Sequence, residues 1–212
     1  MFQLIGHQLA HPEAAAYQIA TVLFYPILLI EMAFLAVAAY EAGRFSIEMI
    51  TRFRRRRSVA EIERVAAAAK SELAAGLPAE AAARFAELRH GLFVESFGRG
   101  LVKNPDFRHL SLMKRLADLE FSVSKRLERT RLMIRIGPIL GLMTTLIPIS
   151  PALIGLARGD VKALSENLIV AFSTTVVGLL IGALGYVMTA VRDRVYAQDV
   201  SDVEYALEML EV

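Results

Sequence analysis

Three long apolar windows divide this sequence. They cover Gln18–Gly43, Ile136–Ala157 and Asn167–Val191, and the only charged residues inside them are Glu31 and Glu41. A helix rises about 1.5 Å per residue, so roughly 20 apolar residues are enough to cross the hydrocarbon core of a bilayer. All three windows reach this length. The pattern therefore predicts an all-α integral membrane protein with three transmembrane helices.

The stretches between the windows also have helical patterns, but they are highly charged. Alanine-rich segments interspersed with charges favour helix over residues 43–135, with breaks at Gly76-Leu77-Pro78 and Asn104-Pro105. Two apolar stripes then follow at spacings of three and four, and the first predicts a helix that continues into the second span. The stripes comprise Leu112, Leu116, Leu119, Val123 and Leu127, and in the tail Tyr196, Val200, Val203, Leu207 and Leu210.

The distribution of Lys and Arg predicts the orientation in the membrane. Residues 1–17 contain none, whereas residues 43–135 contain 20, and basic residues near span ends favour the cytoplasmic side. We therefore expect a multi-pass protein of the cytoplasmic (inner) membrane with its N-terminus outside and its C-terminus in the cytoplasm. The expected spans are residues 18–43, 133–157 and 167–191. An amphipathic segment 1–17 and a short turn 158–166 lie outside, and a helical domain 44–132 and a C-terminal helix 192–212 lie in the cytoplasm. We expect long helices to extend from the spans into the cytoplasmic domain.

Charge also suggests which soluble segments meet. The tail 192–212 has a net charge of −4, against +9 for residues 43–135, so we expect its apolar stripe to pack on the middle domain with its acidic face toward arginines. The arginines just inside the first span favour contact with anionic lipid headgroups over nucleic acid. These arginines are Arg52, Arg54, Arg55, Arg56 and Arg57.

Composition removes several classes of chemistry. The chain has no cysteine, which excludes disulfides, thiolate zinc sites and a cysteine nucleophile. The four histidines lack metal-ligand spacing, and the sequence has no glycine-rich phosphate loop and no nucleophile elbow. We expect no enzymatic activity, no cofactor and no metal.

Small and hydroxylated residues gather on one face of each of the last two spans. Such faces indicate close helix packing, with threonines bonded to backbone carbonyls, or else a polar constriction on an ion path. In the third span they are Ala171, Thr175, Gly178, Gly182, Gly185 and Thr189, and in the second Gly137, Gly141, Thr144 or Thr145, Pro148, Ala152 and Gly155.

The strings GPILGLMTTLIPISPAL and AFSTTVVGLLIGALG resemble the MotA/TolQ/ExbB proton-channel family. The resemblance is specific over residues 127–190, and the three-span layout is nearer to TolQ and ExbB than to MotA. Matching positions are Gly137, Pro138, Leu140, Gly141, Leu142 and Thr145 in the second span, and Ala171, Thr175, Gly178 and Leu179 in the third. The departures include Thr144, Pro148, Val170, Phe172 and Leu184, which indicate a divergent branch.

The resemblance implies the channel-forming subunit of an ion-driven motor. Such subunits form a homo-pentamer around a dimer of a single-span partner of the ExbD/TolR/MotB type, which supplies a membrane aspartate. Here it implies an ion path lined by hydroxyls, and helix packing by small residues and prolines. The hydroxyl residues are Thr145, Thr175, Thr144, Ser173 and Thr174, and the packing residues are Gly137, Pro138, Gly141, Pro148, Ala171, Gly178, Gly182 and Gly185.

Other interpretations stay open at this stage. The transported ion is a proton or sodium, and a non-conducting oligomeric membrane scaffold is the alternative function. Glu31 lies 13 residues from Arg44, roughly 20 Å into the membrane, and an acid at that depth indicates a functional site. It is either part of a proton entrance or a protonated acid bonded to a neighbouring helix.

Overall fold

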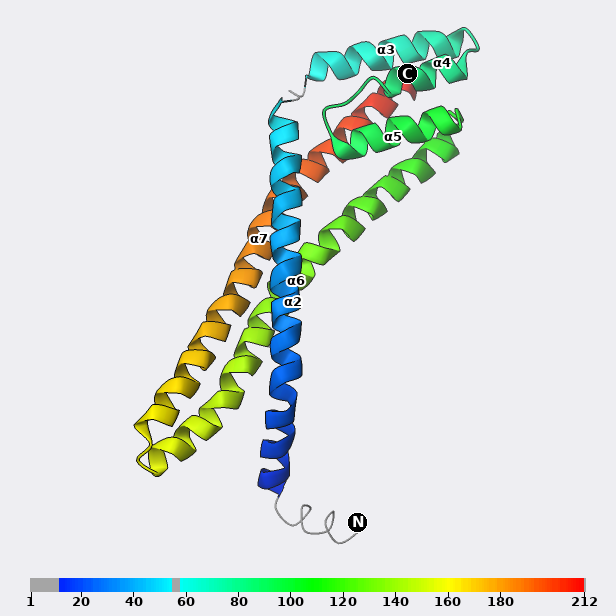
Figure 1. The fold of residues 1–212 in the computed structure, drawn as a ribbon. Helices are drawn as coiled ribbons and strands as arrows, with labels where there is room; N and C mark the ends of the chain where they lie inside the picture. Colours follow the sequence, from blue (N-terminus) through cyan, green and yellow to red (C-terminus); the bar gives the residue numbers. More distant parts are fainter. Residues whose placement is uncertain (1–11, 55–57, 212) are drawn as a thin grey trace. The chain divides into compact units, whose positions relative to one another are not determined.

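The computed structural model describes residues 12–54 and 58–211, and every regular element within them is a helix (Figure 1). The helices are α2 (Pro12–Arg54), α3 (Val59–Ala74), α4 (Pro78–Phe85), α5 (Leu92–Lys103), α6 (His109–Ala157) and α7 (Val161–Glu211). This confirms the all-α class. Of the expected N-terminal segment, residues 1–11 lie outside the described part, and residues 12–17 belong to α2.

Three of the helices are long and apolar enough to cross a membrane. Their most apolar windows have mean hydropathies of 2.3, 1.9 and 2.2 in α2, α6 and α7, in agreement with the expected class of protein with three transmembrane helices. Only 17%, 33% and 33% of these windows are buried within the chain. The remaining apolar surface needs lipid or other subunits to cover it, because exposed apolar faces of this extent are rare on soluble monomers.

Two of the breaks between the shorter helices lie where the sequence predicts them, whereas the break between α4 and α5 at residues 86–91 was not expected. Gly76 ends the α3 segment with a φ of 76°, a left-handed conformation that glycine adopts without a steric cost, and Pro78 opens α4. α5 ends at Lys103, directly before Asn104-Pro105. From His109 onward α6 continues without interruption into the span, as the apolar stripe indicates.

Prolines inside the long helices do not end them. Pro26 lies within α2, and Pro138, Pro148 and Pro151 lie within α6. Each proline removes one backbone hydrogen bond, and in membrane helices neighbouring helices and hydroxyl side chains compensate for this loss.

The turn between α6 and α7 is shorter than the expected segment 158–166. α6 ends at Ala157 and α7 begins at Val161, so residues 161–166 are helical. Two local features make the tight turn possible. Gly159 adopts a φ of 74°, and Asp160 accepts a hydrogen bond from the Ala163 backbone N–H at 3.0 Å, which caps the new helix.

The chain divides into two compact units. Unit 1 comprises Met1–Ala42 and Arg131–Val187, and unit 2 comprises Gly43–Thr130 and Met188–Val212. Each long helix contributes to both. The divisions fall within about one helical turn of the expected span ends at residues 43, 133 and 191.

Unit 2 is built around an apolar core to which the C-terminal tail contributes. Tyr196, Val203 and Leu207 are at most 3% exposed and pack with residues of α3, α4, α5 and α6. Val200 and Leu210 are partly buried against the same core. The expected packing of the tail stripe on the middle domain is therefore confirmed.

Candidate functional site

Backbone-to-backbone packing between α6 and α7 is the main feature of unit 1. A Cβ added to Gly178 would lie 2.6 Å from the Gly137 carbonyl oxygen and 2.7 Å from the Gly141 Cα. A Cβ on Gly137 would lie 2.8 Å from the Gly178 oxygen, and one on Gly182 would lie 2.9 Å from Pro138. No side chain fits at such separations, so these glycines let the two backbones touch.

This packing agrees with the first of the two interpretations of the small-residue faces. The faces of the second and third spans pack against each other inside one chain. Ala171 is also buried, at 1% exposed. The surface left for other subunits or lipid is instead made of large apolar residues, including Leu142, Leu146, Phe172 and Val176.

Two threonines meet in the same seam. The hydroxyls of Thr145 on α6 and Thr175 on α7 are in hydrogen-bond contact. Each hydroxyl also lies within hydrogen-bond distance of a carbonyl of its own helix, Thr145 of Gly141 at 2.6 Å and Thr175 of Ala171 at 3.0 Å, and one of the two hydroxyls donates to the other. Both side chains are half-buried. The two residues singled out at matching family positions therefore form one polar pair between apolar helices.

Thr144 belongs to a different pair. Its hydroxyl lies 3.0 Å from Oε2 of Glu31 on α2, and both residues are fully buried at 0% exposed. The sequence suggested Thr144 as one more pore hydroxyl and left the role of Glu31 open. The structure brings the two together, and neighbouring threonines of α6 thus connect this helix to α2 and α7.

The other two hydroxyls of α7 that we expected on the ion path, those of Ser173 and Thr174, bond within their own helix among the interactions described. Ser173 is exposed and donates to the Ile169 carbonyl at 2.7 Å. Thr174 is 7% exposed and donates to the carbonyls of Val170 and Ala171.

Pro148 of α6 and Gly185 of α7 are buried, in agreement with a packing role.

In unit 2, Asp199 joins three helices. Its carboxylate binds Arg52 of α2 through two hydrogen bonds of 2.9 and 2.7 Å, and it accepts the Phe93 backbone N–H at the start of α5 at 3.2 Å. Any side chain at Gly91 would collide with this carboxylate. Arg52, which we expected at lipid headgroups, is thus held by the tail, whereas Arg54 is exposed.

The other arginines of that run, Arg55, Arg56 and Arg57, lie outside the described residues. Asp202 of the tail faces a histidine instead of an arginine. His90 Nε2 and Asp202 Oδ2 are 3.0 Å apart, and both side chains are buried.

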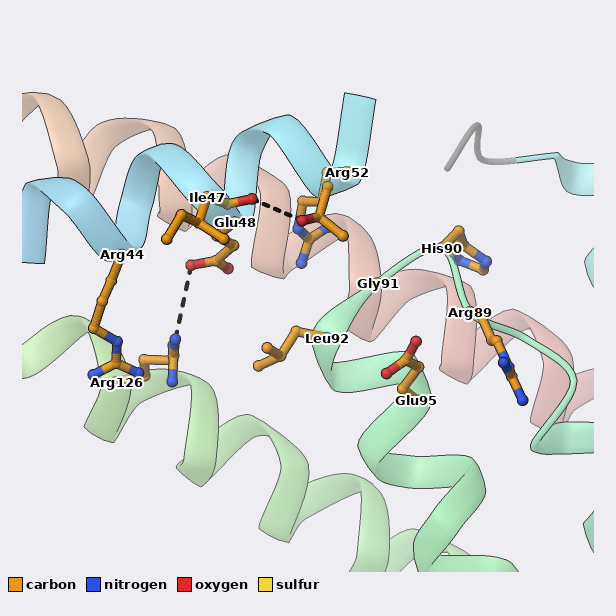
Figure 2. A pocket seen from close by; sticks show the side chains of 11 residues that line it. Arg44, Ile47, Glu48, Arg52, Arg89, His90, Gly91, Leu92, Glu95 and Arg126 are labelled. Atoms are coloured by element: carbon orange, nitrogen blue, oxygen red, sulfur yellow. Dashed lines mark hydrogen bonds and ion pairs between the residues drawn. The ribbon is translucent and has the colours of Figure 1, made fainter. Parts of the chain in front are cut away.

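A cavity of about 380 Å³ opens beside this network (Figure 2). Arg44 and Arg126 lie at one end of it, and Arg89 lies at the other. Glu48 between them pairs with Arg126 at 3.8 Å and with the buried Arg192 at 3.4 Å. The charged side chains of the lining are four arginines and two glutamates, Glu48 and Glu95, so basic groups are in excess.

Two partly buried polar contacts of unit 2 were not predicted from the sequence. Arg126 Nε donates to the Tyr196 hydroxyl at 3.0 Å, and burial together with a hydrogen bond to Glu48 raises the pKa of Tyr196 to about 12. Thr189 donates to Thr130 across α7 and α6 at 2.7 Å. Thr189 lies on the small-residue face of the third span, so the sequence indicated that it packs against another helix. No pattern around Thr130 indicates that it is the partner of Thr189.

These features define a class of protein: an all-α, multi-pass membrane protein whose spans carry hydroxyls and two buried acids, Glu31 and Glu41. Within the described residues no cluster of three or more His, Cys, Asp or Glu could hold a metal ion. Residues 87–204 match the model of the MotA/TolQ/ExbB proton channel family, and this match covers more than half of the chain. The chain belongs to that family, which consists of channel components of ion-driven complexes and not of enzymes. Comparisons with curated proteins and with solved structures gave no match.

Proposed function

We propose that this chain is the channel-forming, stator-like subunit of an ion-driven membrane motor that couples proton or sodium flow to mechanical work. The membership of the family supports the channel role. The observation that carries the proposal further is the Thr145–Thr175 pair, which places two hydroxyls opposite each other where the surrounding helices are apolar.

The residue types of the spans support a division of labour with a partner. Residues 136–157 and 167–187 contain hydroxyls but no charged side chain. A path through them needs a carboxylate from elsewhere to take up and release the ion. We assign this group to a membrane aspartate on a dimer of a single-span ExbD/TolR/MotB-like protein, enclosed by a homo-pentamer of this chain.

The proposed setting is the cytoplasmic membrane, with the N-terminus outside and the C-terminus in the cytoplasm. Unit 1 then occupies the membrane and unit 2 the cytoplasm. Basic residues lie where α2 would leave the bilayer, at Arg44 and Arg54. The run Arg54–Arg57 and the basic cavity of unit 2 both favour contact with anionic lipid headgroups at this level.

The decisive experiment is co-purification with a candidate partner, namely a single-span protein that has an aspartate in its span. Native mass measurement in mild detergent and in lipid should give five copies of this chain and two of the partner. A stable monomer or dimer under both conditions would refute the pentamer.

One observation favours a second function, a non-conducting membrane scaffold. The glycines and threonines of α6 and α7 are used for packing within one chain, which is all that a scaffold requires. The two functions differ in one measurement. A motor subunit with its partner collapses an imposed ion gradient across vesicles, whereas a scaffold assembles with the same stoichiometry and leaves the gradient intact.

A further inference from the structure

Glu31 is a carboxyl group buried in the apolar part of unit 1. It is 0% exposed, and of its two oxygens Oε2 lies 3.0 Å from the Thr144 hydroxyl. The other oxygen, Oε1, is buried without a hydrogen-bond partner. An ionised carboxylate in such a place would have only the Thr144 hydroxyl and the Gly178 backbone beside it to offset the cost of leaving water.

The hydrogen bonds of Thr144 indicate that the Glu31 carboxyl is protonated. Its hydroxyl has one hydrogen but three oxygens within reach: Glu31 Oε2 at 3.0 Å, the Leu140 carbonyl at 3.0 Å and the Gly141 carbonyl at 3.1 Å. A carbonyl can only accept. If Thr144 donates to its own helix, the carboxyl must supply the hydrogen of the contact with Oε2, and Glu31 is then neutral.

Among the described residues of unit 1, no cation forms an ion pair with Glu31 that would stabilise a negative charge. The nearest charged residue of α6 is Arg135, nine residues from Thr144 or roughly 14 Å along the helix. Within unit 1, the charged residues of α7 are Lys162 and Glu166, which precede the apolar window 167–191. On α2 the next acid after Glu31 is Glu41, ten residues further along the helix.

The contact also suits an acid that exchanges its proton. When the carboxyl O–H breaks and the proton passes to a water molecule, the Thr144 hydroxyl can turn from the carbonyls to Oε2 and donate to the anion. The same 3.0 Å contact thus serves both states. A purely structural contact needs only a donor and an acceptor, which glutamine supplies without any cost of ionisation.

We propose that Glu31 and Thr144 form an exchangeable proton-binding site between α2 and α6, carried by this chain itself and distinct from the Thr145–Thr175 pair. Its role in transport rests on the proposed channel function. Because Thr144 and Thr145 are adjacent on α6, a rotation of the Thr144 hydroxyl takes place next to the Thr145–Thr175 pair.

Infrared spectroscopy of the purified protein in lipid tests the site without any transport assay. The wild-type protein at neutral pH should show a carbonyl-stretch band of a protonated carboxylic acid that Glu31→Gln removes and that moves to lower frequency in heavy water. Thr144→Val should shift the band to higher frequency, because a hydrogen bond is lost, whereas Thr174→Val should leave it in place. A spectrum unaffected by Glu31→Gln, or a band that does not respond to heavy water, overturns the proposal.

Gradient-driven activity tests the role in transport. Glu31→Gln should assemble normally and lose about 100-fold or more in activity, the size of loss expected when a proton-transferring side chain is removed. Full activity of Glu31→Gln overturns this role. If that variant fails to assemble, Thr144→Val replaces it, and a wild-type rate then overturns the role. Lack of activity in the wild-type complex would instead refute the proposed motor, while the infrared result still decides the site.

Discussion

At the residue scale, neighbouring hydroxyls in unit 1 have different partners. Thr145 contacts Thr175 across the α6–α7 seam, whereas Thr144 contacts Glu31 of α2. Successive residues of a helix point about 100° apart, which explains why adjacent threonines reach different helices. Thr144 therefore cannot serve as a control for Thr145, whereas Thr174 and Ser173, within the described residues, bond to carbonyls of their own helix.

Replacing the paired threonines by valine tests the proposed ion path. Thr145→Val and Thr175→Val keep the shape of the side chain but remove the hydroxyls, so gradient-driven activity should be lost. Assembly should persist, because a hydrogen bond between membrane helices contributes only about 1 kcal/mol. Thr174→Val and Ser173→Ala are the matched controls. Equal activity in all four variants would remove the pair from the path, and loss of assembly in the first two would assign it to packing.

Asp199 is the residue on which several contacts of unit 2 depend. It is 1% exposed, binds Arg52 bidentately and caps the first turn of α5. Asp199→Asn should therefore destabilise unit 2 by about 2–3 kcal/mol, somewhat less than for a fully buried pair because Arg52 is partly solvated. Thermal unfolding of the purified protein in detergent measures this change.

Asp118→Asn is the control for this prediction. Asp118 forms an exposed pair with Lys114 one turn earlier on α6, and such pairs contribute about 0.5 kcal/mol or less. If both variants unfold at the same temperature, the network around Asp199 does not stabilise the unit.

At the scale of elements, the α6–α7 hairpin depends on the absence of side chains. Gly178→Ala would force a Cβ to within 2.7 Å of backbone atoms of Gly137 and Gly141, and backbone cannot move aside as a flexible side chain can. The two helices must separate, so we expect a loss of about 1–3 kcal/mol, as for overpacked cores.

Gly43→Ala provides the matched control in another helix. A Cβ at Gly43 has no neighbour within 4 Å, so alanine should be neutral or stabilise α2 by up to about 1 kcal/mol through its higher helix propensity. Thermal unfolding and protease resistance in detergent measure both changes. A Gly178→Ala protein as stable as Gly43→Ala would show that the close contact is not required.

At the scale of the whole molecule, the same three helices pass through an apolar unit and a charged one. Their apolar windows remain largely exposed within one chain, which is the surface that lipid and neighbouring subunits would cover. The proposed orientation puts the α6–α7 turn outside and the start of α6 in the cytoplasm.

Single cysteines can test that orientation directly, because the chain contains none. Lys162→Cys beside the turn and Asp118→Cys in α6 both replace exposed side chains. In intact cells whose periplasm is accessible, a membrane-impermeant maleimide should label the first variant only, and permeabilisation should expose the second. Labelling of Asp118→Cys alone would reverse the orientation.

The sequence by itself determined the helical class, two of the breaks between helices and the family. These depend on local or one-dimensional properties: the length of apolar windows, the period of apolar stripes, and glycine and proline at breaks. The apolar stripe from Tyr196 to Leu210 also predicted that the tail packs on the middle domain, because the tail has one apolar face to bury.

Only the tertiary structure decided which polar groups meet. Glu31 and Thr144 are 113 positions apart, and Arg52 and Asp199 are 147 apart, so no helical period connects them. The sequence also indicated a small-residue face on each of two spans without saying that the faces pair within one chain. A face of glycines can pack against any helix that approaches closely. Which helix does so depends here on the turn at Gly159 between α6 and α7.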